Sequence, residues 1–185
     1  MSSDLKDELA KAGLTTAVAK TAATPCYIQQ VFDTYKRSMS GLVITSPLPE
    51  TITLRDENFP YWIKLQWHNP IAKSWQDASP AKVLPFLLAG TFDEKGYRLE
   101  DPRRARVLPH LPKLLRDPDA IYENAGFIRG KHIYAREHKG QLKVALTVTD
   151  PRLKTVIVVS SFKTSKRWLA KHAKRPVYPK GKATS

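Results

Sequence analysis

Hydrophobic residues recur with a helical period in the first part of the chain and alternate with polar residues in the last third. In residues 24–41 the apolar positions lie three or four apart, Pro25 suits a first helical turn, and Gly41 suits a helix end. This pattern predicts a helix whose buried stripe is Ile28, Val31, Phe32, Tyr35 and Met39. Residues 3–13 predict a shorter surface helix, and residues 79–90 predict a third helix.

Residues 103–124 combine an apolar face with several prolines. The face consists of Val107, Leu108, Leu111, Leu114 and Leu115, and Pro112 limits the helix that carries it. Asp117 is then expected to cap a second short helix with Pro118 in its first position. The segment therefore predicts two helical pieces before the strands begin.

Three segments of the last third have strand patterns. Residues 131–136 alternate, with Ile133 and Ala135 on one face and His132, Tyr134 and Arg136 on the other. Residues 142–149 alternate in the same way, whereas residues 155–162, "TVIVVSSF", are apolar on both faces, as a central strand is. Turns are expected at 137–141 and at 150–151. Three consecutive antiparallel strands after helices predict an α+β domain, with an antiparallel sheet of about four strands packed against N-terminal helices.

The segments that flank these strands have other patterns. Residues 42–54 contain two short extended pieces separated by prolines, which is typical of a linker or an edge strand. Residues 165–174 predict a basic helix with Ser165 as its N-cap, and residues 175–185 have the composition of a disordered tail. We therefore expect an N-terminal helical extension at 1–48, an α+β domain at 49–165, and a basic helix and tail at 166–185.

The composition is typical of a globular chain without membrane segments. Of the 185 residues 42% are hydrophobic, and no apolar run approaches the roughly 20 residues that a membrane helix needs. The start of the chain, "MSSDLKDELAKAG", lacks the apolar segment of a secretory signal. Cys26 is the single cysteine and cannot form an internal disulfide. These features predict a protein of the reducing cytoplasm with no membrane partner.

Positive charge is concentrated in the second part of the chain. Residues 1–102 carry a net charge of −1, whereas residues 103–185 carry +15 and account for the whole excess. No acid follows Asp150, although ten basic residues do. A field of this sign attracts polyanions, and nucleic acid is the commonest of them inside cells. The same charge also suits a solubilising surface, so charge alone leaves both roles open.

Several chemistries lack the residues that they need. No glycine-rich phosphate loop is present, the five histidines show no helical pairing of metal ligands, and the basic half has no carboxylate cluster. We expect neither a metal site nor a cofactor. The abundant groups are His, Lys, Arg, Ser and Thr, which suit metal-independent cleavage of RNA by its own 2′-hydroxyl. In that reaction histidines move protons, and cations and hydroxyls stabilise the phosphate.

The order of four segments resembles the phage-associated branch of the barnase, EndoU, colicin and RelE group of nucleases. The segments are "TLRDENFPYWIKLQWHNPI", "VLPHLPKLLRDPDAIYEN", "HIYAREHKGQLKVALTVTD" and "KTVIVVSSFKT". In those proteins a histidine-containing region precedes a helix that ends in a Pro-Asp turn, and the last strand of an antiparallel sheet ends in Ser or Thr. The resemblance covers roughly residues 50–165 and implies a small, toxin-like endoribonuclease of phage or mobile-element origin that works without metal.

The resemblance also implies roles for particular residues. His68 is similar to the family's N-terminal histidine, and Arg136 is similar to the cation that holds the phosphate. Ser161, with Ser160 and Thr164 nearby, is similar to the terminal hydroxyl donor. The sequence departs from the pattern where many relatives carry a second histidine, because Tyr61 and Trp62 stand there. His110 or His132 is then the candidate for the second acid or base.

The basic C-terminal part supplies the remaining contacts to the phosphate backbone of RNA. These candidates are His132, Lys163, Lys166, Arg167, Trp168, Lys171, Lys174 and Arg175. Two other functions stay open: a virion-structural or nucleic-acid-binding protein that does not cut, and a partner-binding adapter that uses the N-terminal helices. For the nuclease we expect the cytoplasm of a bacterial host or the virion as the location, and a phage head protein or an immunity protein as further partner.

Overall fold

A computed structural model describes residues 28–125, 131–150 and 155–179 of the chain. It is an α+β protein with a seven-stranded mixed sheet and a three-stranded antiparallel sheet. The described residues form two compact units: the first contains residues 28–41 and 55–109, and the second contains residues 42–54 and 110–179. The predicted helix at 3–13 and Pro151 of the predicted turn lie outside the described residues, and the predicted domain boundaries stay a prediction.

The first unit is built on helix α3 (Ile28–Ser38), which the helical period predicts. Its buried stripe meets an aromatic cluster in which Phe32, Tyr35, Phe59 and Trp62 contact one another at ring distances of 5.0 to 6.1 Å. The other elements of this unit are η1 (Asp56–Asn58), α4 (Phe59–Trp62), α5 (Pro80–Ala89) and the strands β3 (Leu65–Asn69), β4 (Ser74–Asp77) and β5 (Tyr97–Leu99). The three strands pair in the order β4-β3-β5. The helix at 79–90 is confirmed, and Gly90 ends it in the left-handed conformation with φ of 69°.

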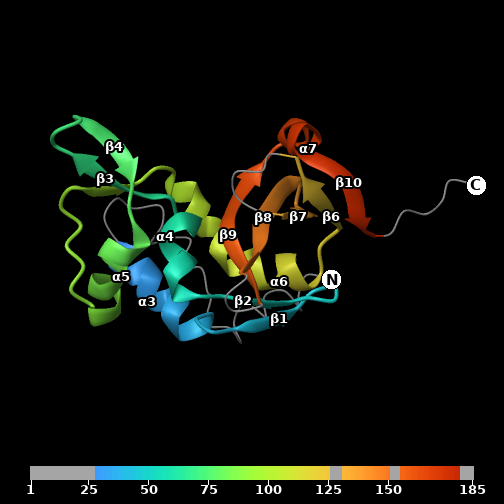
Figure 1. Cartoon of the computed structure of the whole chain (residues 1–185), viewed down its shortest axis with the longest axis horizontal. Helices are drawn as coiled ribbons and strands as arrows, with labels where there is room; N and C mark the ends of the chain where they lie inside the picture. The colour runs from blue at the N-terminus through green and yellow to red at the C-terminus, as the bar shows by residue number, and fades with distance from the viewer. Residues whose placement is uncertain (1–27, 126–130, 151–154, 180–185) are drawn as a thin grey trace, which may run out of the picture. The chain divides into compact units, whose positions relative to one another are not determined.

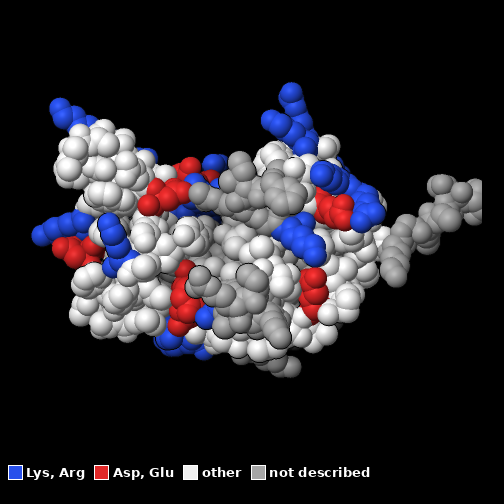
Figure 2. Space-filling view, in the orientation of Figure 1, with Lys and Arg blue, Asp and Glu red and all other residues white. Residues whose placement is uncertain are grey.

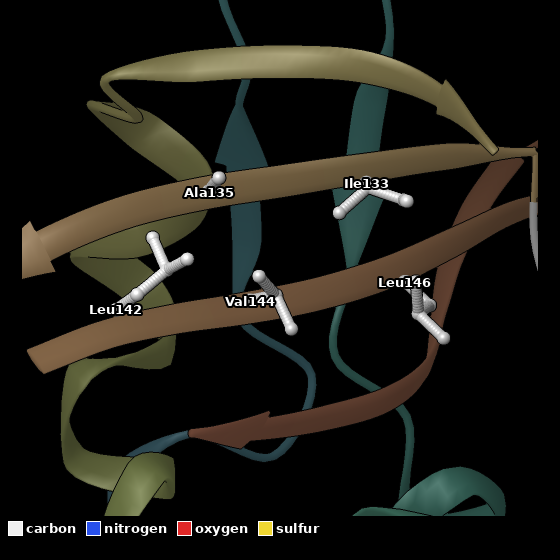
Figure 3. Close-up of a cluster of buried hydrophobic side chains, with 5 residues drawn as sticks. All are labelled: Ile133, Ala135, Leu142, Val144 and Leu146. Atoms are coloured by element: carbon white, nitrogen blue, oxygen red, sulfur yellow. The ribbon is translucent and has the colours of Figure 1, made fainter. Parts of the chain in front are cut away.

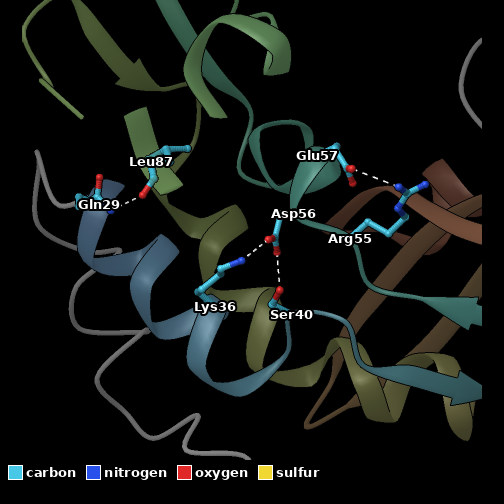
Figure 4. A network of polar contacts seen from close by, with 7 residues as sticks. All are labelled: Gln29, Lys36, Ser40, Arg55, Asp56, Glu57 and Leu87. Atoms are coloured by element: carbon cyan, nitrogen blue, oxygen red, sulfur yellow. Dashed lines mark hydrogen bonds and ion pairs between the residues drawn. The ribbon is translucent and has the colours of Figure 1, made fainter. Parts of the chain in front are cut away.

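A polar network around Asp56 ties the end of α3 to η1 (Figure 4). The Asp56 carboxylate accepts hydrogen bonds from Lys36 Nζ at 2.5 Å and from Ser40 Oγ at 2.6 Å. The side chain of Asp56 is only 18% exposed, so these bonds are shielded from water more than a surface pair is. A second pair, Arg55 with Glu57 at 3.1 Å, lies in the same loop but is more exposed.

We expect the substitution Asp56→Ala to lower the free energy of unfolding by about 2 kcal/mol, because it removes two hydrogen bonds to a partly buried charge. Urea denaturation monitored by tryptophan fluorescence measures this change. Glu57→Ala is the matched control, and its cost should stay below about 1 kcal/mol, as for other exposed pairs. Equal costs for the two variants would contradict the role of Asp56.

The second unit contains the seven-stranded sheet, which Figure 1 shows in yellow, orange and red with two blue to cyan strands at its edge. Its strands are β1 (Val43–Thr45), β2 (Thr51–Thr53), β6 (Ala120–Asn124), β7 (His132–His138), β8 (Gln141–Asp150), β9 (Thr155–Thr164) and β10 (Ala173–Tyr178). The order is β1-β2-β9-β8-β7-β6-β10. Strand β2 runs parallel to β9, and all other neighbours are antiparallel. Strand β9 is therefore an interior strand with β2 and β8 on its two sides, as its continuous apolar sequence predicts.

The two faces of this sheet are covered by different helices. On one face Ile133, Ala135, Leu142, Val144 and Leu146 form a buried cluster, shown in Figure 3, against which Trp168 and Leu169 of α7 (Lys166–His172) pack. Helix α6 (Leu111–Arg116) packs against β7 and β8, and it follows η2 (Pro102–His110). All five residues of the predicted apolar face at 107–115 are buried. The N-cap of α7 is also confirmed, since Ser165 Oγ accepts a hydrogen bond from the Trp168 N–H at 3.1 Å.

Three expectations about this unit are wrong. The sheet has seven strands and is mixed, not four antiparallel strands, because the short pieces at 42–54 form β1 and β2, and β2 adds to β9. For these pieces the edge-strand alternative is confirmed, since β1 is an edge of the sheet, and the linker alternative is wrong. No helix follows Asp117: the Asp119 N–H donates to the Ala135 carbonyl, and its carboxylate accepts from the Glu137 N–H, so the chain is held extended and enters β6. The start of the predicted tail belongs to β10, because residues 173–178 pair with the open edge of β6.

Candidate functional site

Three neighbouring strands carry a cation at the same register. Arg136 on β7 lies opposite Lys143 on β8, and Lys143 lies opposite Lys163 on β9. Opposed residues of antiparallel strands share a face, and successive residues alternate between faces. All three side chains therefore project from one face of the sheet, and the buried cluster that contains Ile133, here called the Ile133 cluster, lies on the other face. We call these three residues the cationic row.

The charge of the cationic row is only partly compensated. Arg136 Nη1 donates to the Asp117 carboxylate at 2.7 Å and also to the Asp117 carbonyl oxygen. Within the described ranges no carboxylate pairs with Lys143 or Lys163. Lys143 is only 8% exposed, and burial, then Lys163 and Lys139, lower its pKa from 10.5 to about 8. Like charges opposite one another on adjacent strands destabilise a sheet, so the row is suited to an anion that compensates them.

Two histidines lie beside the row. His110 stands at the N-cap of α6, His138 ends β7, and their ring centroids are 6.1 Å apart. Burial, then Lys143 and His138, lower the pKa of His110 to about 4. Burial and the charge of Lys143, followed by weaker contributions from other cations, also lower the pKa of His138. Both imidazoles are therefore neutral at pH 7 and can accept a proton.

These groups together match the needs of phosphoryl transfer. Cations at the row can hold the non-bridging oxygens of a phosphodiester. A neutral imidazole can remove a proton, and a lysine whose pKa is about 8 is still protonated at pH 7 and can return one. Arg136 and His110 of this cluster are candidates from the sequence, as is Lys163. His138 and Lys143 were missed.

The predicted hydroxyl donors at the end of β9 do not lie together. Ser161 is on the same face as Lys163, two residues earlier in the strand and opposite Ala145. It is fully buried there, and its Oγ has no hydrogen-bond partner among the described residues. Thr164 lies opposite Leu142, on the other face of the strand. The strand end thus divides its polar residues between two faces, and only the face of Ser161 contains the cationic row.

His132 lies away from the row. It is buried near the start of β7, where its Nδ1 is 3.9 Å from Glu50 Oε2. Burial lowers its pKa, although Glu50 opposes that shift. Its neighbour on the same face, Tyr134, shares a hydrogen bond of 2.7 Å with Ser46. The structure therefore gives His132 a polar environment inside the unit and little exposed surface for RNA.

The basic candidates after the sheet gather on α7 and β10, where Figure 2 shows Lys and Arg side chains at the surface. Lys166 pairs with Glu137 at 3.2 Å, and Arg175 pairs with Glu123 at 2.7 Å. The exposed cations without an ion pair in the described part of this surface are Arg167, Lys171 and Lys174. We call these three residues the basic surface.

Trp168 does not belong to the basic surface. It packs against the Ile133 cluster, meets Phe162 edge to face at 5.0 Å and stacks on His172 at 4.2 Å. Its ring therefore contributes to the core of the sheet face that α7 covers.

His68 belongs to the first unit, whereas the other catalytic candidates belong to the second. It lies on the exposed part of β3, opposite Trp75 of β4, with the two ring centroids 5.3 Å apart and tilted at 68°. Its predicted role as acid or base stays a prediction. Of the three tryptophans between residues 56 and 102, Trp62 is fully buried, Trp67 is half-buried and Trp75 is exposed.

A signal for the missed residues was present in the hairpin pattern. A turn centred on Lys139 and Gly140 places position 136 opposite 143 and position 138 opposite 141. This register aligns Lys143 with Arg136 and brings His138 to the same face. Sequence alternation alone gives the face of each residue but not its partner, so the two cations could not be paired without the turn geometry.

Comparisons of the chain with protein-family models, with curated proteins and with solved structures gave no match. The resemblance to the nuclease group therefore stays a prediction from short motifs. In the described ranges no helix has the length and apolar character that crossing a bilayer requires. The same residues contain no group of three or more His, Cys, Asp or Glu side chains arranged to hold a metal ion.

Proposed function

We propose that the second unit binds RNA at the cationic row and cleaves it with the RNA's own 2′-hydroxyl as nucleophile. The observation that supports this proposal most directly is the alignment of Arg136, Lys143 and Lys163, in which a buried lysine lacks a carboxylate partner among the described residues. Such an arrangement costs stability in the free protein, and a bound anion would offset that cost. Two neutral histidines beside it add proton acceptors.

The reaction needs one proton acceptor and one proton donor. The 2′-oxygen attacks the adjacent phosphorus while His138 accepts the 2′-hydroxyl proton. The bond between phosphorus and the 5′-oxygen breaks, and Lys143 donates a proton to that oxygen. The products are a 2′,3′-cyclic phosphate and a free 5′-hydroxyl. Arg136 and Lys163 hold the non-bridging oxygens, where negative charge grows in the transition state.

The basic surface supports a polymeric substrate over a small phosphate. Each exposed cation that meets a backbone phosphate adds affinity that falls as salt rises. Arg167, Lys171 and Lys174 would therefore bind phosphates of the same chain outside the cleavage site. A toxin role, a phage origin and a head or immunity partner stay predictions of the motifs alone.

The test is cleavage of total bacterial RNA by the purified chain in excess chelator. We expect fragments that end in a 2′,3′-cyclic phosphate, and resistance at a site that carries a single 2′-deoxyribose. His138→Ala should reduce the rate about 100-fold or more, as loss of a general base does. A requirement for divalent metal, or cutting at the 2′-deoxy site, would refute the proposal.

Three further variants complete this assay. Lys171→Ala is the matched control, because it removes an exposed lysine of the basic surface that is not part of the row. It should weaken RNA binding but leave the rate per bound RNA unchanged. His110→Ala tests the second imidazole, and His68→Ala tests the role that the motifs predict. A rate that depends on His68 but not on His138 would transfer the general base to the first unit.

A second function, binding without cleavage, is favoured by the cations of the basic surface, which form no ion pair with the described residues. It requires only phosphate contacts, so affinity should fall steeply with salt while the RNA stays intact. Intact RNA after long incubation with a chain that binds it tightly would favour this function over cleavage.

A further inference from the structure

Four planar side chains lie on one face of the three-stranded sheet in the first unit. Trp75 of β4 is opposite His68 of β3, and Arg98 of β5 is opposite Gln66 of β3. Because positions 66 and 68 share a face, so do their partners. The Arg98 guanidinium lies 4.2 Å from the Trp75 ring centroid, and its Nε donates to Gln66 Oε1 at 3.1 Å. We call His68, Trp75, Arg98 and Gln66 the planar face.

Three residues of the planar face are open to solvent, whereas Gln66 is buried. Trp75 is 36% exposed, every residue of β4 is exposed, and so are His68 and Arg98. A large aromatic ring usually packs in a core, and a single exposed one is unremarkable in itself. Here, however, the Arg98 guanidinium lies over the exposed indole, and the His68 imidazole meets the indole in an edge-to-face arrangement.

Charge selects the kind of ligand. The partners of Arg98 are an amide oxygen and an aromatic ring, and in the described part of the unit no carboxylate pairs with it. The acid on the same face, Asp77, is already paired with Lys64 at 3.2 Å. A ligand for this face is therefore flat, because it must cover an indole, and negatively charged, because it must compensate a guanidinium. A nucleotide in an unpaired strand has both properties, since its base offers a face and its phosphate a charge.

We propose that the planar face binds an unpaired nucleotide of single-stranded RNA, with the base stacked at Trp75 and the phosphate near Arg98. The choice of RNA rests on the proposed function, whereas the site itself lies wholly in the first unit. It makes single-stranded RNA the substrate class, because bases inside a duplex cannot expose their faces.

The test measures binding of the full chain to a short 2′-O-methyl oligoadenylate, which has no free 2′-hydroxyl and is not cleaved. Trp75→Ala should weaken binding of the single strand by about 5- to 150-fold, the range for the loss of one stacked base. Trp75→Phe should keep most of the affinity. Trp75→Ala should change the affinity for the same oligonucleotide in a duplex by no more than about twofold.

Phe86→Ala is the matched control, because Phe86 is an exposed aromatic of α5 in the same unit but outside the planar face. It should leave both affinities unchanged, and circular dichroism checks that each variant is folded. Unchanged single-strand binding in folded Trp75→Ala would overturn the proposal and leave the face to another occupant, such as a protein. Equal losses for single strand and duplex, or for Trp75→Ala and Phe86→Ala, would overturn it as well.

The outcomes also separate this proposal from the proposed function. RNA that stays intact while binding depends on Trp75 would refute cleavage and support the planar face. Cleavage of a structured RNA at a rate that Trp75→Ala leaves unchanged would support the proposed function and refute the role of the planar face.

Discussion

We expect Lys143→Met to stabilise the protein while it abolishes most of its RNA cleavage. The pKa of Lys143 is lowered from 10.5 to about 8, so keeping this lysine charged in the fold costs about 3 kcal/mol at pH 7. Methionine has a similar length without the charge, and we expect the free energy of unfolding to rise by about 2 kcal/mol. Loss of the proton donor and of a phosphate contact should lower the cleavage rate about 100-fold or more.

Urea denaturation at pH 7 and RNA cleavage in chelator measure the two effects on the same preparation. Lys171→Met is the control, because Lys171 is an exposed lysine of the basic surface on α7. It should leave the free energy of unfolding and the rate per bound RNA unchanged, although it should weaken RNA binding. If Lys143→Met is stabilised but keeps full activity, the cationic row has no role in cleavage. A destabilised variant would mean that the lysine contributes to the fold, and the cost assigned to its charge would then be wrong.

The size of the Lys143 effect also depends on pH. In the unfolded chain the lysine keeps its proton up to about pH 10.5, whereas in the fold it loses the proton near pH 8. The unfolded state therefore binds more protons between these values, and the contribution of Lys143 to stability becomes less unfavourable as pH rises through this window. Lys143→Met should remove this dependence, so its gain in stability shrinks from pH 8 to pH 10.5.

We expect a bell-shaped dependence of kcat/KM on pH, with a limb on each side of neutrality. His138 must be neutral to accept the 2′-hydroxyl proton, and its pKa is lowered from 6.5, so activity rises with pH through a value below 6.5. Lys143 must be protonated to act as the acid, so activity falls as pH rises through about 8. Beyond each pKa the rate should change about tenfold per pH unit.

Lys143→Arg provides the sharpest control for this profile. Arginine keeps its charge at every pH of the assay, so it can hold the phosphate but cannot release a proton. The basic limb should disappear in this variant, the acidic limb should remain, and the maximal rate should be lower. A basic limb that persists near pH 8 in Lys143→Arg would assign the acid to another residue.

Local patterns predicted a large part of the second unit. The alternation at 131–136 and 142–149 assigned each residue to the correct face, and the apolar run at 155–162 identified the central strand. The helix stripe from Ile28 to Met39 and the cap at Ser165 were also predicted. These features follow from neighbouring residues, because side-chain periods and capping bonds extend over only a few positions.

The strand pairings could not be predicted in the same way. Strand β2 pairs with β9 and β6 pairs with β10, although about 100 and 50 residues separate the partners along the chain. Asp119 illustrates the difference: Pro118 before it favoured a helix, but hydrogen bonds with Ala135 and Glu137, both of β7, hold it extended. Pairing across the sheet outweighed the local preference there.

The sequence by itself determined the α+β class, the surplus of positive charge after residue 102 and the faces of the strands, because each depends on composition or on nearest neighbours. Only the tertiary structure decided which polar residues meet. The register aligned Lys143 between Arg136 and Lys163 and placed Thr164 on the other face. Burial then lowered the pKa of Lys143 and of the two nearby histidines, since that shift depends on desolvation and on charges brought together by folding.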